Sequence, residues 1–121
     1  MADKEIQIIR QPIDPSQLEP LAAAWFGTMI QGVVALEREV AALGGGSPMD
    51  ANVVLIADGS EQQNVWGFNL YPDERGGPAI EYISLINIRP GQGNRGMELE
   101  DEQLRDRVRA ILSHLVPHLE L

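Results

Sequence analysis

The feature that most limits the possible folds is a long series of apolar residues spaced three or four positions apart, between residues 21 and 43. This spacing places side chains on one face of an α-helix. The apolar set is Leu21, Ala22, Trp25, Phe26, Met29, Val33, Leu36, Val40 and Leu43. Three glycines follow at positions 44–46 and favour a helix end, because glycine adopts the left-handed C-cap conformation and propagates a helix poorly. The pattern predicts one helix over residues 21–43, with its start left open between Ser16 and Leu21.

A helix of that length leads us to expect a homodimer. About 24 residues span on the order of 36 Å, whereas strands of six or seven residues cover about 20 Å. The apolar face continues to the end of the predicted helix, so its overhanging part needs cover from another helix or another chain. We therefore expect a homodimer formed through residues 21–43.

The remaining elements form a strand-rich middle and a second helix. Residues 5–10 predict a short strand, and residues 53–57 and 65–71 predict a hairpin joined by the polar segment between them. Residues 80–88 predict a further strand, and residues 100–116 predict a helix with acids in its first turn. The expected order is β-α-β-β-β-α. This indicates an α+β fold, with a mostly antiparallel sheet of three or four strands and two helices on one face.

Length and composition predict one domain spanning residues 1–121 and exclude several chemistries. A chain of 121 residues lies within the usual single-domain range of roughly 50–200 residues. Cysteine is absent, which excludes disulfides, thiolate metal sites and cysteine nucleophiles and fits a reducing cytoplasm. The longest uncharged run has 17 residues, shorter than the roughly 20 apolar residues that a membrane-spanning helix needs. We expect a cytoplasmic protein with no membrane segment.

The charge of the chain argues against nucleic-acid binding. The net charge is −9, whereas phosphate backbones bind surfaces rich in lysine and arginine. Five of the eight arginines nevertheless lie within 21 residues, at positions 89, 95, 105, 107 and 109. Acidic residues at positions 98, 100, 101, 102 and 106 lie among them, so pairing within the chain competes with any external anion.

The segment over residues 89–102 is the most unusual part of the chain. It is polar, contains three glycines, and links a predicted strand to a predicted helix start, a geometry that can hold an anion. It lacks the spacing of a phosphate loop or a dinucleotide fingerprint. The candidate ligand-binding residues here and in the preceding strands are Asn69, Asn87, Arg89, Gln92, Asn94, Arg95, Glu98 and Asp101. The competing interpretation is an ordered loop held by internal arginine–carboxylate pairs, with the strand amides bonded to neighbouring loops.

No metal, cofactor or nucleophile pattern stands out. His114 and His118 have a four-residue spacing that can place two imidazoles on one helical face, but Pro117 lies between them. The acids of residues 98–106 lack a calcium-loop pattern, and acidic first turns are common because of the helix dipole. We therefore predict no metal site and no cofactor.

Two stretches carry a resemblance to a known family. The first runs from Asp58 through Trp66 to Pro72, and the second from Leu85 to Arg95, followed by acids at positions 100–102. They resemble a bacterial single-domain family catalogued as a domain of unknown function, and the resemblance covers most of the chain. It implies no reaction, cofactor or partner.

Two functional hypotheses follow from these observations. The first is a non-enzymatic cytosolic binding or protein-interaction module, favoured by the long apolar face and the lack of a catalytic motif. The second is a small hydrolase or transferase for a phosphate or carboxylate substrate. In it, Arg89 and Arg95 hold the anion, Asn87 and Asn94 orient it, and Glu98 or Asp101 acts as acid, base or metal ligand. An open pocket with unpaired arginines favours the second hypothesis, and closed arginine–carboxylate pairs favour the first.

Overall fold

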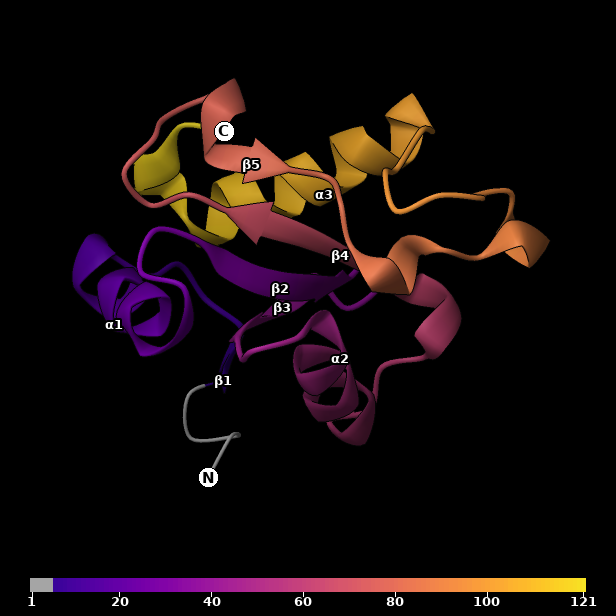
Figure 1. The fold of residues 1–121 in the computed structure, drawn as a ribbon, viewed down its shortest axis with the longest axis horizontal. Helices are drawn as coiled ribbons and strands as arrows, with labels where there is room; N and C mark the ends of the chain where they lie inside the picture. The colour runs from indigo at the N-terminus through magenta and orange to yellow at the C-terminus, as the bar shows by residue number, and fades with distance from the viewer. Residues whose placement is uncertain (1–5) are drawn as a thin grey trace.

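A computed structural model describes residues 6–121, in which an antiparallel sheet of five strands carries helices on both faces (Figure 1). The strands are β1 (Ile6–Ile9), β2 (Ile30–Ala35), β3 (Val40–Gly44), β4 (Val65–Leu70) and β5 (Ile80–Glu81). The α-helices are α1 (Pro15–Trp25), α2 (Pro48–Ala57) and α3 (Glu102–Leu115). The strand order is β1-β3-β2-β4-β5. The predicted α+β class and antiparallel sheet are confirmed, although residues 6–121 contain more strands and one more α-helix than expected.

The predicted helix over residues 21–43 is wrong beyond its first turns. α1 starts after Asp14, whose side chain accepts a hydrogen bond from the Ser16 N–H, and it ends at Trp25. Residues 30–44 form the β2–β3 hairpin. The spacing was misleading because both strands are buried on both faces, so they lack the apolar–polar alternation of a half-buried strand. The helical dimer surface expected from residues 21–43 is therefore not formed.

The strand predicted over residues 53–57 is also wrong, because this segment belongs to α2. Ser47 caps the helix by accepting from the Met49 N–H, and Pro48 occupies the first turn, where its missing N–H has no cost. The β-branched run after this cap favoured a strand. The expected hairpin with residues 65–71 is absent, and β4 pairs with β2 and β5 instead. Of the strand predicted over residues 80–88, only β5 forms, and the 3-10 turn η4 (Leu85–Asn87) follows.

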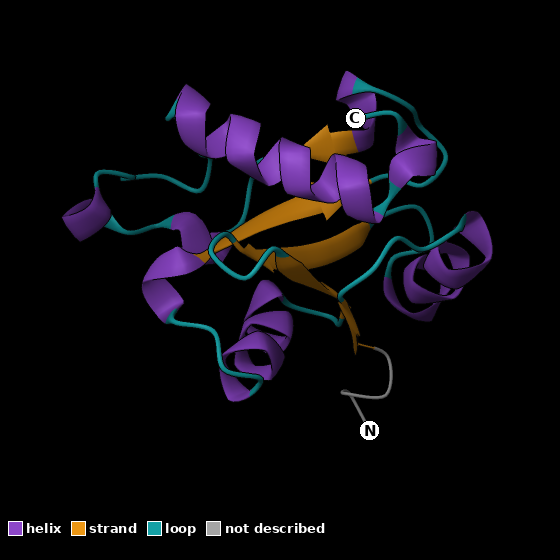
Figure 2. Ribbon diagram, turned by 180° about the vertical axis from the view of Figure 1, so that it is seen from behind, coloured by secondary structure: helices purple, strands orange, loops and turns teal. Residues whose placement is uncertain are grey.

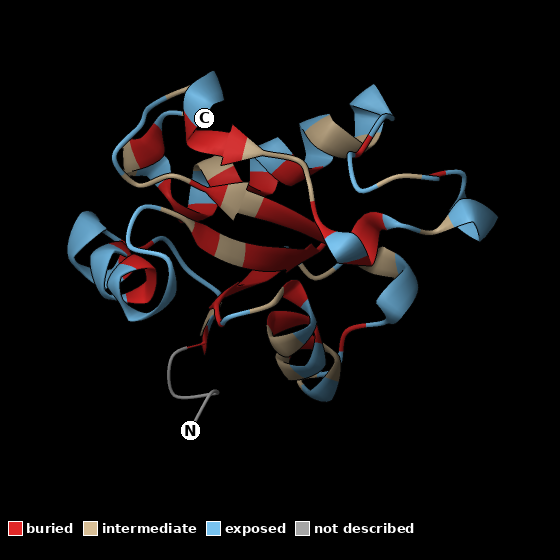
Figure 3. Ribbon diagram, in the orientation of Figure 1, coloured by how far each residue is buried: buried red, intermediate tan, exposed pale blue. Residues whose placement is uncertain are grey.

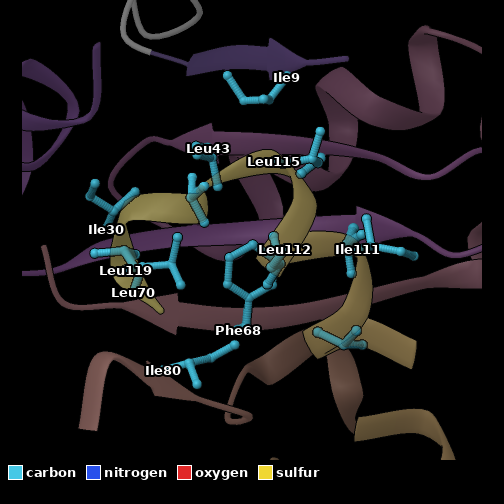
Figure 4. Close-up of a cluster of buried hydrophobic side chains, with 14 of the residues drawn as sticks. Ile9, Ile30, Leu43, Phe68, Leu70, Ile80, Ile111, Leu112, Leu115 and Leu119 are labelled. Carbon is cyan, nitrogen blue, oxygen red and sulfur yellow. The ribbon is translucent and has the colours of Figure 1, made fainter. Parts of the chain in front are cut away.

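Two apolar clusters hold the layers together. The larger cluster lies between the sheet and helices α1 and α3, and Phe68, Leu112 and Leu115 are among its most buried members (Figure 4). The smaller cluster packs Leu55 of α2 against Val33 on the opposite face. α3 crosses the near face of the sheet in Figure 2 and lies behind it in Figure 1. Two helices share one face as predicted, and the unexpected α2 covers part of the other.

No α-helix within residues 6–121 combines the length and the hydrophobicity that crossing a bilayer requires.

Asp58, at the end of α2, joins two arginines that are distant in the sequence. Its carboxylate oxygens accept from Arg10 and Arg38, each at 2.6 Å. The bond to Arg10, followed by that to Arg38, lowers the pKa of Asp58 below its ordinary value of 3.8. The Asp58 carboxylate therefore binds a proton more readily in the unfolded chain than in the folded protein, and its ion pairs stabilise the fold while it is ionised. The stabilisation is fully present above about pH 4 and is lost as the pH falls through the folded-state pKa.

We expect Asp58→Asn to flatten the acid side of the stability–pH profile, because the variant has no carboxyl group to titrate at this site. Urea unfolding between about pH 5 and pH 2 covers the range in which this carboxyl group titrates. Asp73→Asn is the matched control, since Asp73 is exposed and forms no ion pair with residues 6–121. If Asp58→Asn and Asp73→Asn show the same profile, the predicted linkage is wrong.

Candidate functional site

Asn87 completes the edge of β4 in place of a neighbouring strand. Its side chain is fully buried in η4. The Asn87 Oδ1 accepts from the Gly67 N–H at 2.8 Å, and its Nδ2 donates to the carbonyl oxygens of Gly67 and Met97 at 3.0 and 3.1 Å. β5 pairs only with the last two residues of β4, so one side-chain amide satisfies both backbone groups of Gly67 where the ladder is missing.

Arg89 is held by backbone carbonyls and an indole ring. Its guanidinium carbon lies 3.8 Å from the centroid of the Trp66 ring. The guanidinium donates to the carbonyl oxygens of Gln62 at 2.7 Å, of Ile86 at 3.1 Å, and of Val65. Burial lowers the pKa of Arg89. The prediction of an arginine–carboxylate pair is therefore wrong for Arg89. Its hydrogen bonds instead connect η4 to β4 and to the turn that precedes β4.

Gln92 and Asn94 stabilise the same loop from inside. The Gln92 Oε1 accepts from Arg89 at 3.2 Å, and its Nε2 donates to the Gln63 carbonyl at 3.0 Å. Asn94 is buried, and its Nδ2 donates to three backbone carbonyl oxygens at 2.9–3.0 Å. Its Oδ1 accepts a hydrogen bond from the backbone N–H of Glu100 at 3.2 Å. The amides expected to orient a ligand therefore bind the backbone of the protein.

Three further candidates lie along the connection to α3. Arg95 is exposed and forms no hydrogen bond or ion pair with residues 6–121. Glu98 accepts from Arg105 at 3.1 Å, which is the kind of internal pair that the sequence suggested. Asp101 caps α3 by accepting from the Gln103 N–H at 2.8 Å. The loop is thus held mainly by side chain–backbone bonds, with one arginine–carboxylate pair beside them.

A shallow groove opens between α2 and η4, next to Arg89. It has a volume of about 280 Å³ and is lined by Met49, Asn52, Gln62, Leu85, Ile86, Ile88 and Arg89. Met49, Leu85 and Ile88 are 50%, 57% and 45% exposed, and Val53, one turn after Met49 on α2, is 63% exposed. Met49, Leu85 and Ile88 line this groove, and Val53 lies beside it on α2; we call these four residues the apolar groove. The side-chain amides of Asn52 and Gln62 exchange two hydrogen bonds at 2.8 and 2.9 Å, which leaves the groove predominantly apolar in character.

A second cluster crosses three strands of the sheet. Gln31, Asn69 and Glu81 are consecutive cross-strand partners on β2, β4 and β5, and Tyr71 follows two residues after Asn69. The Glu81 Oε1 accepts from the Tyr71 hydroxyl at 2.5 Å and from the Asn69 Nδ2 at 3.2 Å. The bond to Glu81, together with burial, raises the pKa of Tyr71 to about 12, so its hydroxyl remains a donor at neutral pH. We call these four residues the polar row.

Of this row, Asn69 alone was among the ligand-binding candidates predicted from the sequence. Gln31 lay inside a segment assigned to a helix, and the contact between Glu81 and Asn69 depends on strand register. The alternation of Asn69 and Tyr71 in the strand predicted over residues 65–71 was the one available signal.

Comparison with known protein families finds one match. A family model described as "Protein of unknown function (DUF5674)" matches residues 7–115, which is most of the chain. The chain belongs to this family. The match confirms the resemblance to an uncharacterised single-domain family. No curated protein and no solved structure matches the chain.

The two histidines of this family member lie on different elements. His114 is in the last turn of α3, whereas His118 lies beyond Pro117 in the 3-10 turn η6 (Pro117–Leu119). Burial, followed by the charge of Arg75, lowers the pKa of His118. Within residues 6–121, no three or more His, Asp or Glu side chains are grouped so as to hold a metal ion.

Proposed function

We propose that this chain is a non-enzymatic, cytoplasmic protein-binding module that receives a partner segment in the apolar groove. The observation that carries the proposal is the exposure of Met49, Val53, Leu85 and Ile88 on adjoining elements. Scattered apolar side chains are ordinary on protein surfaces, whereas several around one groove are typical of interaction sites. The absence of cysteine from the sequence fits a reducing compartment.

The size and the charge of the surface indicate the kind of partner. Four partly exposed side chains present on the order of a few hundred Å², whereas a standard stable interface buries about 800 Å² on each partner. The groove therefore suits a short segment better than a second copy of the chain. The net charge of −9 attracts basic sequences. We infer an amphipathic helix with basic residues outside its apolar face, because such a face presents apolar side chains to a groove at helical spacing.

The alternative of a small hydrolase or transferase for an anionic substrate has less support. It requires Arg89 to hold the anion, but the guanidinium of Arg89 donates to three backbone carbonyls. It also assigns Glu98 as an acid, a base or a metal ligand, and Glu98 pairs with Arg105. These contacts favour a structural role for both residues.

Leu85→Asp is expected to weaken binding of such a helix by at least about tenfold, because a charged side chain replaces an apolar contact of the groove. The probe is a fluorescently labelled amphipathic peptide with leucines at four-residue spacing and lysines on its other faces. Fluorescence anisotropy measures the dissociation constant. The variant should fold, since the Leu85 side chain is more than half exposed.

Phe26→Asp is the matched control for this measurement. Phe26 is 44% exposed at the end of α1 and does not line the groove, so this variant should bind the peptide as the unaltered chain does. Equal losses in both variants, or no loss in Leu85→Asp, contradict the proposal. A dimer that sediments as such and that Leu85→Asp dissociates would assign the groove to a second copy of the chain.

A further inference from the structure

The polar row places acceptor oxygens on three neighbouring strands at the same level of the sheet. Gln31 faces Asn69, and Asn69 faces Glu81, in direct cross-strand register. Opposite side chains in such pairs have Cβ atoms about 4.5–5.5 Å apart. All three residues project from the sheet face that packs on α2 elsewhere, because they alternate with the buried residues of the α3 side.

The hydrogen bonds within the row leave acceptors without donors. Glu81 uses one carboxylate oxygen for both Tyr71 and Asn69. The Gln31 Oε1 is buried and accepts no hydrogen bond from residues 6–121. A buried acceptor without a partner is costly and rare in folded proteins. Rotation about the last side-chain torsion of glutamine is soft, so this oxygen can turn toward a ligand lying on the row.

The carboxylate of Glu81 also has no ion-pair partner within residues 6–121. The negative charge of Glu81 therefore lies beside amide oxygens without an internal cation.

Two of the three strands that carry the row, β4 and β5, lie outside the part of the sheet on which α2 mainly packs. α2 packs mainly on β1, β2 and β3, and α3 lies behind β4 and β5 in Figure 1. In Figure 3, half-buried segments of β2, β4 and β5 lie next to one another across the sheet. Gln31, Asn69, Tyr71 and Glu81 are all half-buried, so part of each residue is exposed to solvent.

We propose that the polar row binds the guanidinium group of a ligand, with Glu81 supplying the charge and Gln31 and Asn69 supplying neutral acceptors. A guanidinium is planar, always charged, and presents five N–H donors in fixed directions. This donor pattern matches several acceptor oxygens spread across a sheet face better than the compact ammonium group does. The site shares no residue with the apolar groove, so it does not rest on the proposed protein-binding function.

The test is a titration followed by ¹⁵N-resolved NMR of the full chain. n-Butylguanidinium should shift the backbone amides of Gln31, Asn69 and Glu81 in a saturable manner, with a dissociation constant on the order of 1 mM. n-Butylammonium should bind at least about threefold more weakly, because it presents fewer donors. Tetramethylammonium, which has no N–H donor, should produce no saturable shift at these residues.

Two variants and one control identify the residues involved. Glu81→Gln should weaken n-butylguanidinium binding by at least about tenfold, and it keeps an oxygen for the Tyr71 hydroxyl. Gln31→Glu should tighten binding several-fold by adding a second carboxylate, so the proposal stays testable if Glu81→Gln fails to fold. Glu98→Gln, which removes an exposed carboxylate outside the row, should leave the affinity unchanged. Equal binding of n-butylammonium, saturable shifts with tetramethylammonium, or unchanged affinity in both row variants would overturn the proposal.

Discussion

Replacement of Asn87 with alanine is expected to lower the free energy of unfolding by about 4 kcal/mol. The change removes three hydrogen bonds and leaves the N–H and C=O groups of Gly67 buried without partners. Each buried polar group deprived of its partner costs about 1–3 kcal/mol. A domain of this size is stable by only about 5–15 kcal/mol, so the variant should lose a large share of its stability. Urea unfolding followed by tryptophan fluorescence measures the change.

Asn64→Ala is the matched control for this prediction. Asn64 is half-buried, and its hydrogen bonds with residues 6–121 use its backbone, so truncation of the side chain should cost less than about 1 kcal/mol. Asn87→Asp separates the acceptor role of the side chain from its donor role. An aspartate can accept from the Gly67 N–H but cannot donate to the carbonyl oxygens of Gly67 and Met97. This variant should remain strongly destabilised. A loss in Asn87→Ala no larger than that in Asn64→Ala would show that Asn87 does not replace a strand.

Elements with strong local signals were predictable from the sequence. β4 alternates aromatic or leucine residues with smaller and polar ones, and its strand was expected at residues 65–71. α3 combines apolar residues at helical spacing with Asp101 as a capping residue, and its bounds differ by only one or two residues from those expected. β1 was expected from its isoleucines, although Glu5 lies outside the described residues. In each case the side chains that decide the structure are neighbours in the sequence.

The central hairpin was not predictable in the same way. β2 and β3 lie between two helical layers, so residues on both of their faces are apolar and the period of two is lost. A continuous apolar run is then compatible with a buried helix as well as with a buried strand. The turn containing Glu37, Arg38 and Glu39, between Leu36 and Val40, was the available sign of a hairpin. Glu39 has a positive φ of 56°, which no sequence pattern in this segment indicated.

The candidate sites depended on contacts between distant residues. Arg89 and Asn87 were recognised as unusual, but their partners lie on β4 and the turn before it, more than 20 positions away in sequence for Arg89. The groove required α2 to be a helix, since adjacent helical turns bring Met49 and Val53 close together, whereas an extended strand would hold them far apart. The polar row required the register of β2, β4 and β5. The sequence showed which residues have side chains suited to binding, but it did not show which of them lie close together in the folded protein.

Gly67 is the point where β4 and η4 approach each other most closely. A Cβ atom at this position would lie inside van der Waals contact with the Oγ and Cβ of Ser84 and 3.0 Å from the Ile86 Cγ1. The φ angle of Gly67 is not positive, so the backbone itself accepts alanine, which would ordinarily stabilise a strand. The effect of Gly67→Ala is therefore steric and acts on the turn that carries Asn87.

Gly67→Ala is expected to lower the free energy of unfolding by about 3 kcal/mol, because η4 must move away from β4 to make room. The displacement also lengthens the bonds between Asn87 and Gly67, which links this prediction to the first. Ser84→Gly removes both serine atoms that the new Cβ would meet, so Gly67→Ala/Ser84→Gly should be more stable than the sum of the single changes predicts. A double-mutant cycle by urea unfolding measures this coupling, with Ser113→Gly in place of Ser84→Gly as the uncoupled control. Additive effects in the cycle with Ser84 would show that the approach of η4 to Gly67 is not what excludes a side chain there.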